Sequence, residues 1–224
     1  MILNLLLKMC RKNHIYILEA SLSESILANL LLGGKLAEER NRMSQLESMI
    51  TFFCNKYNVD FNHAQHVSSL SQRIFDQLKE QLGLGDEDAI YLMCASYLHD
   101  IGIFIHNRAH HKHTEYIINS LSFFRLSEEE LKIIACIGRY HRKGSPKYTH
   151  VVYNSLPIEQ RILVQKLSAI LRIANALDLS HKQKVKQLDF EINKNHMSFI
   201  VNSDKNFLLE KADFLEKKSF FEDI

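Results

Sequence analysis

The sequence is poor in residues that interrupt helices, with only seven glycines and two prolines in 224 positions. An all-β protein with many tight turns needs more of both residue types. This scarcity therefore favours helices. The length allows one substantial domain with an ample core, and the apolar share of 46% and charged share of 24% are ordinary for a globular protein.

Cysteine pairs with the spacing of a metal site or a disulfide framework are also missing. The four cysteines lie far apart in apolar, helix-like patterns, which indicates buried thiols in a reducing compartment.

The apolar N-terminal run is followed by its positive charges and has no cleavage site of small residues, so it does not resemble a secretory signal. No run of about 18 apolar residues predicts a membrane span. We therefore expect a cytoplasmic protein that does not act at a membrane.

A strong excess of charge of either sign is missing as well. The formal net charge is +2, and the pI of about 8.3 is only mildly basic. Proteins that bind nucleic-acid duplexes usually show a more basic domain. We therefore expect no nucleic-acid duplex as a partner.

Apolar residues recur with helical spacing through most of the chain. This pattern predicts helices over residues 36–57, 62–82, 87–104, 111–124, 128–141 and 158–178. Ser127 and Glu130 form a capping box at one start, and residues 82–86, LGLGD, predict a stop and a new start. The longest irregular stretch, 142–157, is expected to be a mobile loop.

The two ends of the chain differ from this helical middle. Residues 14–21, HIYILEAS, are strand-like and precede a helix with a capping box at Ser21 and Glu24. After residue 184, two alternating segments predict a hairpin, followed by a last helix. The expected fold is mainly α, a helical bundle with a short N-terminal βα remnant and a small C-terminal hairpin plus helix. The expected parts are 1–35, 36–184 and 185–224.

Histidines are concentrated where a buried helix ends. Five of the twelve lie within residues 97–113, and His99 and Asp100 directly follow the apolar segment 89–98. An ionised carboxylate in such a place is costly unless it is paired or bound to a metal. Imidazole beside carboxylate is a common ligand set for divalent ions. His99 and Asp100 therefore predict a metal site.

Further ligands are expected on neighbouring helices. His63 lies on a stripe that faces the core. His63, His99 and Asp100 are expected to hold one ion, and His113 with His141 a second. A lone histidine on an apolar face is more often a hydrogen-bonded core residue. We interpret the following histidines in that way: His66, His106, His110, His111, His150 and His181.

Basic residues surround His141 in the segment RYHRKGSPK, residues 139–147. One interpretation is a solvated basic loop. The other is that Arg139, Arg142 and Lys143, with Lys112 nearby, bind phosphoryl oxygens, since guanidinium and ammonium groups match their charge. The neighbouring metal-ligand candidate favours the second interpretation.

Three segments, LHDIGIFIHNRAHHKHTEYII, IIACIGRYHRKGSPK and LSAILRIANALDLSHKQ, together resemble one known domain. This is the C-terminal helical domain of the exopolyphosphatase and guanosine pentaphosphate phosphohydrolase (Ppx/GppA) family. The motif HDIG also resembles the HD superfamily of metal-dependent phosphohydrolases. The resemblance implies an HD-type bundle, and it favours His63 over His66 as the upstream ligand.

The resemblance also exposes two departures from the family. The superfamily's last aspartate corresponds to Asn175, a weaker ligand, and Asp178 one turn later is the expected substitute. Residues 14–31 are similar to the closing strand and helix of the family's actin-like domain, but Ser21 to Ser25 replace its glycine-containing motif. The rest of that catalytic domain is absent from the sequence, so its exopolyphosphatase chemistry is not expected.

We therefore predict an HD-type phosphohydrolase that uses one or two divalent ions, Mn, Fe, Zn or Mg. Asp100 and His99 form the expected catalytic core, with Asp100 as a proton acceptor, and the basic residues bind a nucleotide or a polyphosphate-like substrate. An alternative is a non-catalytic module that binds polyphosphate or a nucleotide, or forms a homodimer, alongside an actin-like partner chain. A third is that the chain is the tail of a longer two-domain enzyme.

Overall fold

The structure is a computed structural model that describes residues 40–123, 125–142, 144–193, 196–203 and 205–223. The strand and helix predicted within residues 1–35 lie outside this part. The chain divides into two compact units, Met1–Ser44 and Gln45–Ile224. Apart from helical residues 40–44, the features below belong to the second. No helix in the described residues is long and apolar enough to cross a membrane.

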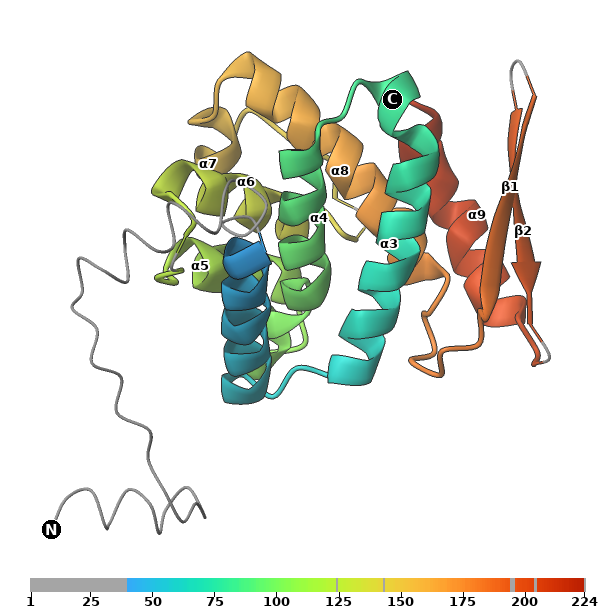
Figure 1. Cartoon of the computed structure of the whole chain (residues 1–224), viewed down its shortest axis with the longest axis horizontal. Helices are drawn as coiled ribbons and strands as arrows, with labels where there is room; N and C mark the ends of the chain where they lie inside the picture. The colour runs from blue at the N-terminus through green and yellow to red at the C-terminus, as the bar shows by residue number, and fades with distance from the viewer. Residues whose placement is uncertain (1–39, 124, 143, 194–195, 204, 224) are drawn as a thin grey trace, which may run out of the picture. The chain divides into compact units, whose positions relative to one another are not determined.

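The described residues are mainly helical, as predicted (Figure 1). Residues 40–56 are helical. The elements that follow are α3 (Phe61–Leu82), α4 (Asp86–Leu98), the 3₁₀ helix η1 (Ile101–Phe104), α5 (His110–Asn119), α6 (Glu128–Arg139), α7 (Val151–Asn154), α8 (Ile158–Ala176), β1 (Gln187–Asn193), β2 (His196–Asn202) and α9 (Leu208–Glu222).

Helix α4 forms the centre of the bundle and packs against α3, α6 and α8. Its residues Leu92, Ala95 and Leu98 are fully or almost fully buried, as expected from the apolar segment 89–98. The predicted capping box at Ser127 and Glu130 starts α6. The described cysteines, Cys54, Cys94 and Cys136, are all buried.

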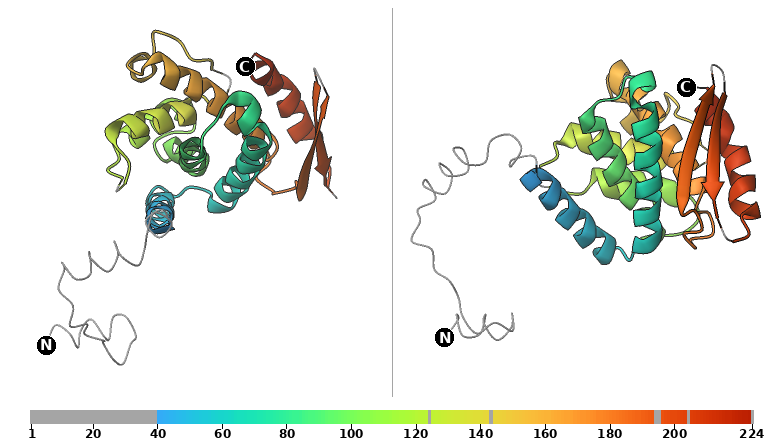
Figure 2. Two further views of the ribbon diagram at one scale, coloured as in Figure 1. Left: turned by 45° about the horizontal axis from the view of Figure 1, so that its top comes forward. Right: turned by 45° about the vertical axis from the view of Figure 1, so that its right-hand side comes forward.

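The C-terminal hairpin and α9 lie together on one side of the bundle (Figure 2). Strands β1 and β2 pair antiparallel, with Phe190 opposite Phe199. Phe199 also stacks edge-on against Phe214 of α9, at 5.1 Å between ring centroids. The other side of α9 packs against α8. These contacts attach the hairpin to the bundle through α9.

The helix predicted over 87–104 is interrupted after Leu98. Thr114 of α5 explains the interruption, because its hydroxyl donates to the His99 carbonyl at 2.8 Å and accepts from the Gly102 amide at 3.1 Å. These bonds replace the helical ladder, and η1 follows. Within the predicted loop 142–157, the short helix α7 forms next to His150, whose ring lies 2.6 Å from the Tyr140 hydroxyl.

Candidate metal centre

Five side chains from different helices meet inside the bundle, and we call them the histidine–aspartate cluster. Asp100 lies in the middle. Its Oδ1 is 3.1 Å from the Nε2 of His110 and 3.5 Å from that of His141. Its Oδ2 is 3.4 Å from the Nε2 of His99 and 3.9 Å from that of His63. Each carboxylate oxygen therefore faces two imidazoles.

In each imidazole, the hydrogen-bond acceptor next to Nδ1, on the side away from Asp100, fixes which ring nitrogen carries the proton. The Nδ1 atoms of His99, His110 and His141 each lie by the backbone carbonyl three residues earlier, at 2.8, 3.0 and 2.5 Å. A carbonyl can only accept, so Nδ1 must donate its hydrogen. In the neutral ring, Nε2 then carries no hydrogen, and its lone pair faces Asp100. This is the usual arrangement of a metal-binding histidine.

His63 has a carboxylate on its far side instead of a carbonyl. Its Nδ1 lies 2.8 Å from Oδ2 of the fully buried Asp178. Burial alone would raise the pKa of Asp178, but His63 and Gln183 hold it below the usual value. The carboxylate is therefore ionised at neutral pH and accepts the His63 proton.

The distances between the imidazoles themselves indicate a site for positive charge. His63 Nε2 lies 3.3 Å from His99 Nε2, and His110 Nε2 lies 3.1 Å from His141 Nε2. Two lone pairs at such distances repel each other because neither nitrogen has a hydrogen to donate. A cation between them removes the repulsion. The chemistry and placement of these donors therefore fit a divalent metal ion.

Electrostatics favour the charge states that a metal requires at Asp100, His63 and His141. Burial alone would raise the pKa of Asp100, but His99, His110 and His141 hold it well below its usual range. Burial and the neighbouring His99 keep the pKa of His141 well below the ordinary value. Burial also lowers the pKa of His63, although Asp178 opposes this effect. Burial also opposes protonation of His99, but Asp100 raises the pKa of His99 above its ordinary value. An ionised Asp100 thus coexists with neutral rings at His63 and His141 at neutral pH.

Two groups of His and Asp side chains in the described residues are placed to hold an ion: Asp100, His110 and His141 in one, and His63, Asp100 and His181 in the other. The ring of His181 stacks on that of His63, with 3.6 Å between centroids and 10° between planes. The lone pairs of stacked rings lie in two nearly parallel planes, so one ion cannot lie in the plane of both rings. His181 therefore covers His63, and its Nδ1 lies 3.1 Å from Asp60 Oδ2.

The structure brings together four of the residues expected as ligands and replaces another. His63, His99, Asp100 and His141 meet, but the residue of α5 beside His141 is His110 and not His113. His113 lies one turn further along α5, is half-buried, and is in neither ligand group of the described residues. Sequence reasoning assigns His110 to the core because spacing alone does not distinguish the neighbouring histidines of the segment HNRAHHKH.

The two candidates after α8 have different positions. Asp178 lies behind His63 and orients it, so its expected place as a direct substitute ligand is not the one observed. Its Oδ1 also accepts from the backbone amide of Gln183 at 2.7 Å. Asn175 is half-buried on α8. Its role as a ligand stays a prediction.

The predicted phosphate-binding residues are scattered over several environments. Lys112 and Arg142 are exposed. Arg139 forms an ion pair with Glu115, so its guanidinium already has a carboxylate partner. Lys143 lies outside the described residues. Arg142 is the member of this set that directly follows a cluster residue, His141, in the sequence.

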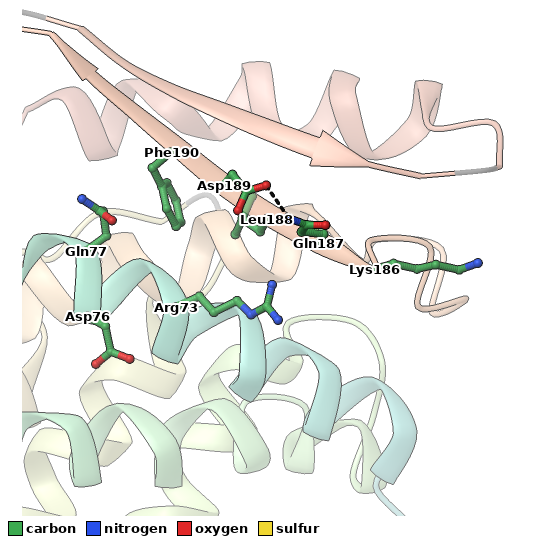
Figure 3. A pocket seen from close by; sticks show the side chains of 8 residues that line it. All are labelled: Arg73, Asp76, Gln77, Lys186, Gln187, Leu188, Asp189 and Phe190. Atoms are coloured by element: carbon green, nitrogen blue, oxygen red, sulfur yellow. Dashed lines mark hydrogen bonds between the residues drawn. The ribbon is translucent and has the colours of Figure 1, made fainter.

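A separate groove lies between α3 and β1 (Figure 3). It is lined by Arg73, Asp76 and Gln77 of α3 and by residues 186–190. Charges of both signs line it, and none of the five cluster residues does. The candidate metal centre is thus distinct from this groove.

The fold and the cluster agree with a family of phosphatases. Residues 46–219 match the family described as Ppx/GppA phosphatase, domain III, and the chain belongs to this family. A guanosine-5'-triphosphate,3'-diphosphate pyrophosphatase of Pseudoalteromonas translucida is 28% identical over 164 residues, covering 69% of this chain and 32% of the relative. One of Pseudoalteromonas atlantica is 27% identical over 142 residues, covering 62% and 27%. The chain spans between about a quarter and a third of the length of these relatives.

Proposed function

We propose that the chain is an HD-type, metal-dependent phosphohydrolase that acts on a phosphate ester or anhydride. One observation carries the proposal: four imidazole Nε2 atoms, each with an acceptor behind its Nδ1, converge on both oxygens of one carboxylate that is only 13% exposed. The fold alone does not require such a set of donors, because apolar residues would fill the same space at a lower free-energy cost of burial. Membership of a phosphatase family agrees with it.

The donor set suggests how ions would be held. Asp100, His110 and His141 would hold one, and His63 and His99, with the other oxygen of Asp100, would hold a second. Imidazole-rich sites suit Zn, Fe or Mn better than Mg, which prefers oxygen ligands and water. When bound, such ions acidify water and polarise a phosphoryl group.

The residues of the chain have distinct tasks in this proposal. Asp100 binds through both oxygens, and its low pKa makes it a weak proton acceptor, so a ligand role suits it better than the expected role as a base. The ring of His99 is oriented by the hydrogen bond from its Nδ1 to the Ser96 carbonyl, and its Nε2 would be a metal ligand. Arg142 and Lys112, both exposed, would neutralise the charge of an approaching phosphate.

The relatives and the basic groups support one substrate class. The two Pseudoalteromonas relatives are pyrophosphatases of a guanosine polyphosphate by name. We propose a nucleotide or polyphosphate-like phosphoanhydride for this chain, cleaved within the helical domain alone. Asn175 favours a second candidate, a module that binds the same phosphates without turnover, because a neutral amide is a weaker ligand than the usual aspartate.

Metal analysis combined with an activity assay tests the proposal. The purified chain should contain one or two equivalents of Zn, Fe or Mn and release phosphate from tripolyphosphate, GTP or guanosine tetraphosphate. His99→Ala should lose metal and turnover, whereas His106→Ala, a change at an exposed histidine, should keep both. Bound metal without turnover would support the second candidate. A metal-free, inactive wild type after reconstitution with Mn²⁺ would refute the first.

A further inference from the structure

Arg172 of α8 is a charged side chain in the interior of the bundle, with only 4% of its surface exposed. Burial lowers the pKa of its guanidinium to about 10, so the group is still charged at neutral pH. A buried charge is costly unless its surroundings compensate for it, and an apolar residue would fill the same place more cheaply. The contacts that only a guanidinium can make therefore indicate what Arg172 does.

The guanidinium of Arg172 holds the chain on both sides of His141. Its Nε and Nη2 donate to the Tyr140 carbonyl at 3.1 and 2.8 Å, and Nη2 also donates to the Gly144 carbonyl at 2.7 Å. A guanidinium carries its donors in one rigid plane, whereas a lysine ammonium is a single point of charge on a flexible stem. Arg172 can therefore fix two carbonyls at once, one before His141 and one after it.

His141 needs such support because it lies beyond the end of a helix. Helix α6 ends at Arg139, and residues 140–142 are neither helical nor in a strand. The hydrogen bond from Nδ1 to the Gly138 carbonyl orients the ring but does not by itself place the backbone of His141. The peptide group that joins residues 140 and 141 is the one whose carbonyl accepts twice from Arg172. The place of the His141 ring in the cluster therefore depends on this buried arginine.

The C-terminal helix contacts the face of the same guanidinium. Helix α9 packs against α8, and the ring of Phe220 on α9 lies 4.0 Å from the guanidinium carbon of Arg172, measured to the ring centroid. A cation over an aromatic face is attracted to it, and more strongly where water is excluded. The ring leaves the in-plane donors of Arg172 free for the two carbonyls. Phe220 thus links α9 to the segment that carries His141.

We propose that Arg172 and Phe220 are positioning residues for the metal centre, which hold His141 where its Nε2 meets Asp100 and His110. The inference rests on the metal centre of the proposed function, and it gives the C-terminal helix a task in that centre. Arg172 itself is not a ligand, because a guanidinium has donors and no acceptor for a cation. The alternative is that the same bonds only complete the end of α6, as basic side chains often do. Their loss would then lower stability without a particular effect on His141.

A double-mutant cycle on metal affinity separates these two roles, with Co²⁺ as the probe and its visible absorption as the readout. Arg172→Lys keeps the charge but loses the two-pronged contact, so the affinity for the ion that His141 binds should fall about 10–100-fold. In a His141→Ala protein, which lacks that ligand, Arg172→Lys should cause no further loss. Arg161→Lys is the matched control, because this arginine of the same helix stacks on Tyr148 instead. It should bind Co²⁺ as the wild type does.

Phe220→Leu tests the contribution of the C-terminal helix. It removes only the ring beside the guanidinium, so the affinity should fall less than in Arg172→Lys, about three- to tenfold, and again only when His141 is present. Phe221→Leu is the control, since the neighbouring ring stacks on Phe199 of the hairpin. Thermal unfolding of every variant without metal measures any loss of stability separately. If Arg172→Lys does not fold, the cycle between Phe220→Leu and His141→Ala decides.

The proposal holds if the losses of Co²⁺ affinity require His141. Equal losses with and without His141 would overturn it, as would wild-type affinity in folded Arg172→Lys. Phosphate release from tripolyphosphate by the same samples tests the proposed function separately. Metal binding that depends on Arg172 in a protein without turnover would support this inference and refute that function. Turnover combined with metal binding that is independent of Arg172 would overturn the inference and leave the function standing.

Discussion

At the scale of single residues, the candidate metal centre is defined by what lies behind each imidazole. Carbonyl groups of the same helix or turn hold Nδ1 of His99, His110 and His141, and Asp178 holds Nδ1 of His63. The acceptors fix the tautomers before any ion binds, which lowers the entropy lost on binding. Two changes test this arrangement.

Replacement of His110 should show which histidine of α5 is a ligand. His110→Ala removes the nitrogen that lies 3.1 Å from Asp100 Oδ1 and should remove about half of the bound metal, if the cluster holds two ions. His113→Ala should leave the metal content unchanged, because His113 is in neither ligand group of the described residues. Elemental analysis of both variants decides whether His110 or His113 is the ligand. Loss of metal only in His113→Ala would make His113 the ligand.

Replacement of Asp178 should weaken metal binding without removing a ligand. Asp178→Asn takes away the charge that makes His63 a better donor, so we expect metal affinity to fall about 10–100-fold. Titration with Mn²⁺, followed by the paramagnetic signal of the free ion, measures the change. The exposed Asp86, changed to Asn, is the control. Unchanged affinity in Asp178→Asn would contradict an orienting role.

At the scale of elements, the close packing of η1 on α5 places Asp100 beside His110. A Cβ on Gly102 would lie 2.5 Å from the Thr114 amide nitrogen and even closer to the His110 carbonyl. Only glycine therefore fits where these two elements meet. The sequence HDIG thus combines ligands with the residue that lets the next helix approach them.

Gly102→Ala should separate the two elements. Forcing a methyl group against backbone atoms costs about 3 kcal/mol of the free energy of unfolding, and the shift of α5 should also release metal. Gly144→Ala is the matched control, because a Cβ there has no atom of the described residues within 4 Å. Denaturant unfolding and elemental analysis measure both effects. A Gly102→Ala protein with wild-type stability and metal content would show that α5 can move without consequence.

The attachment of α9 should depend on pH through Glu210. Burial alone would raise the pKa of Glu210, but Ser180 and Lys184 hold it below the ordinary value of 4.5. A pKa lowered by folding stabilises the protein at pH values above the ordinary one, and the contribution disappears as the pH falls through the folded-state pKa. Stability from this pair is thus expected at neutral pH and not in strong acid.

Glu210→Gln should therefore lower the free energy of unfolding by about 2–3 kcal/mol at pH 7, because it leaves Lys184 without its charged partner. The difference from wild type should shrink near pH 3. Glu222→Gln, at a residue exposed to 58%, should change stability little at either pH. Urea unfolding at both pH values measures these differences. A difference that stays constant with pH would contradict a lowered pKa of Glu210 in the folded protein.

At the scale of the whole molecule, occupancy of the cluster should contribute to stability. A ligand that binds only the folded state, at about 100 times its dissociation constant, adds about 2.7 kcal/mol. For a domain of this size that amount corresponds to about 5–10 °C in Tm. Chelator treatment should therefore lower Tm by this amount, and added Mn²⁺ or Zn²⁺ should restore it. Identical scans with and without metal would count against occupancy.

The helices and the hairpin were largely predictable because their signals are local. The capping box at Ser127 and the left-handed Gly83 mark boundaries that depend on a few neighbouring residues. The end of α4 at Leu98 was not predictable, because Thr114 causes it from another helix. The predicted strand and helix before residue 36, and the cytoplasmic location, stay predictions.

Sequence alone determined the helical periods, the pairing of β1 with β2, and the demand of a buried His99–Asp100 pair for positive charge, since these depend on neighbours in the chain. Only the tertiary structure decided that His110 faces Asp100 and that Asp178 lies behind His63. Side chains more than a hundred positions apart, such as His63 and Asp178, meet only through the packing of whole helices. A change of one turn in that packing selects a different residue.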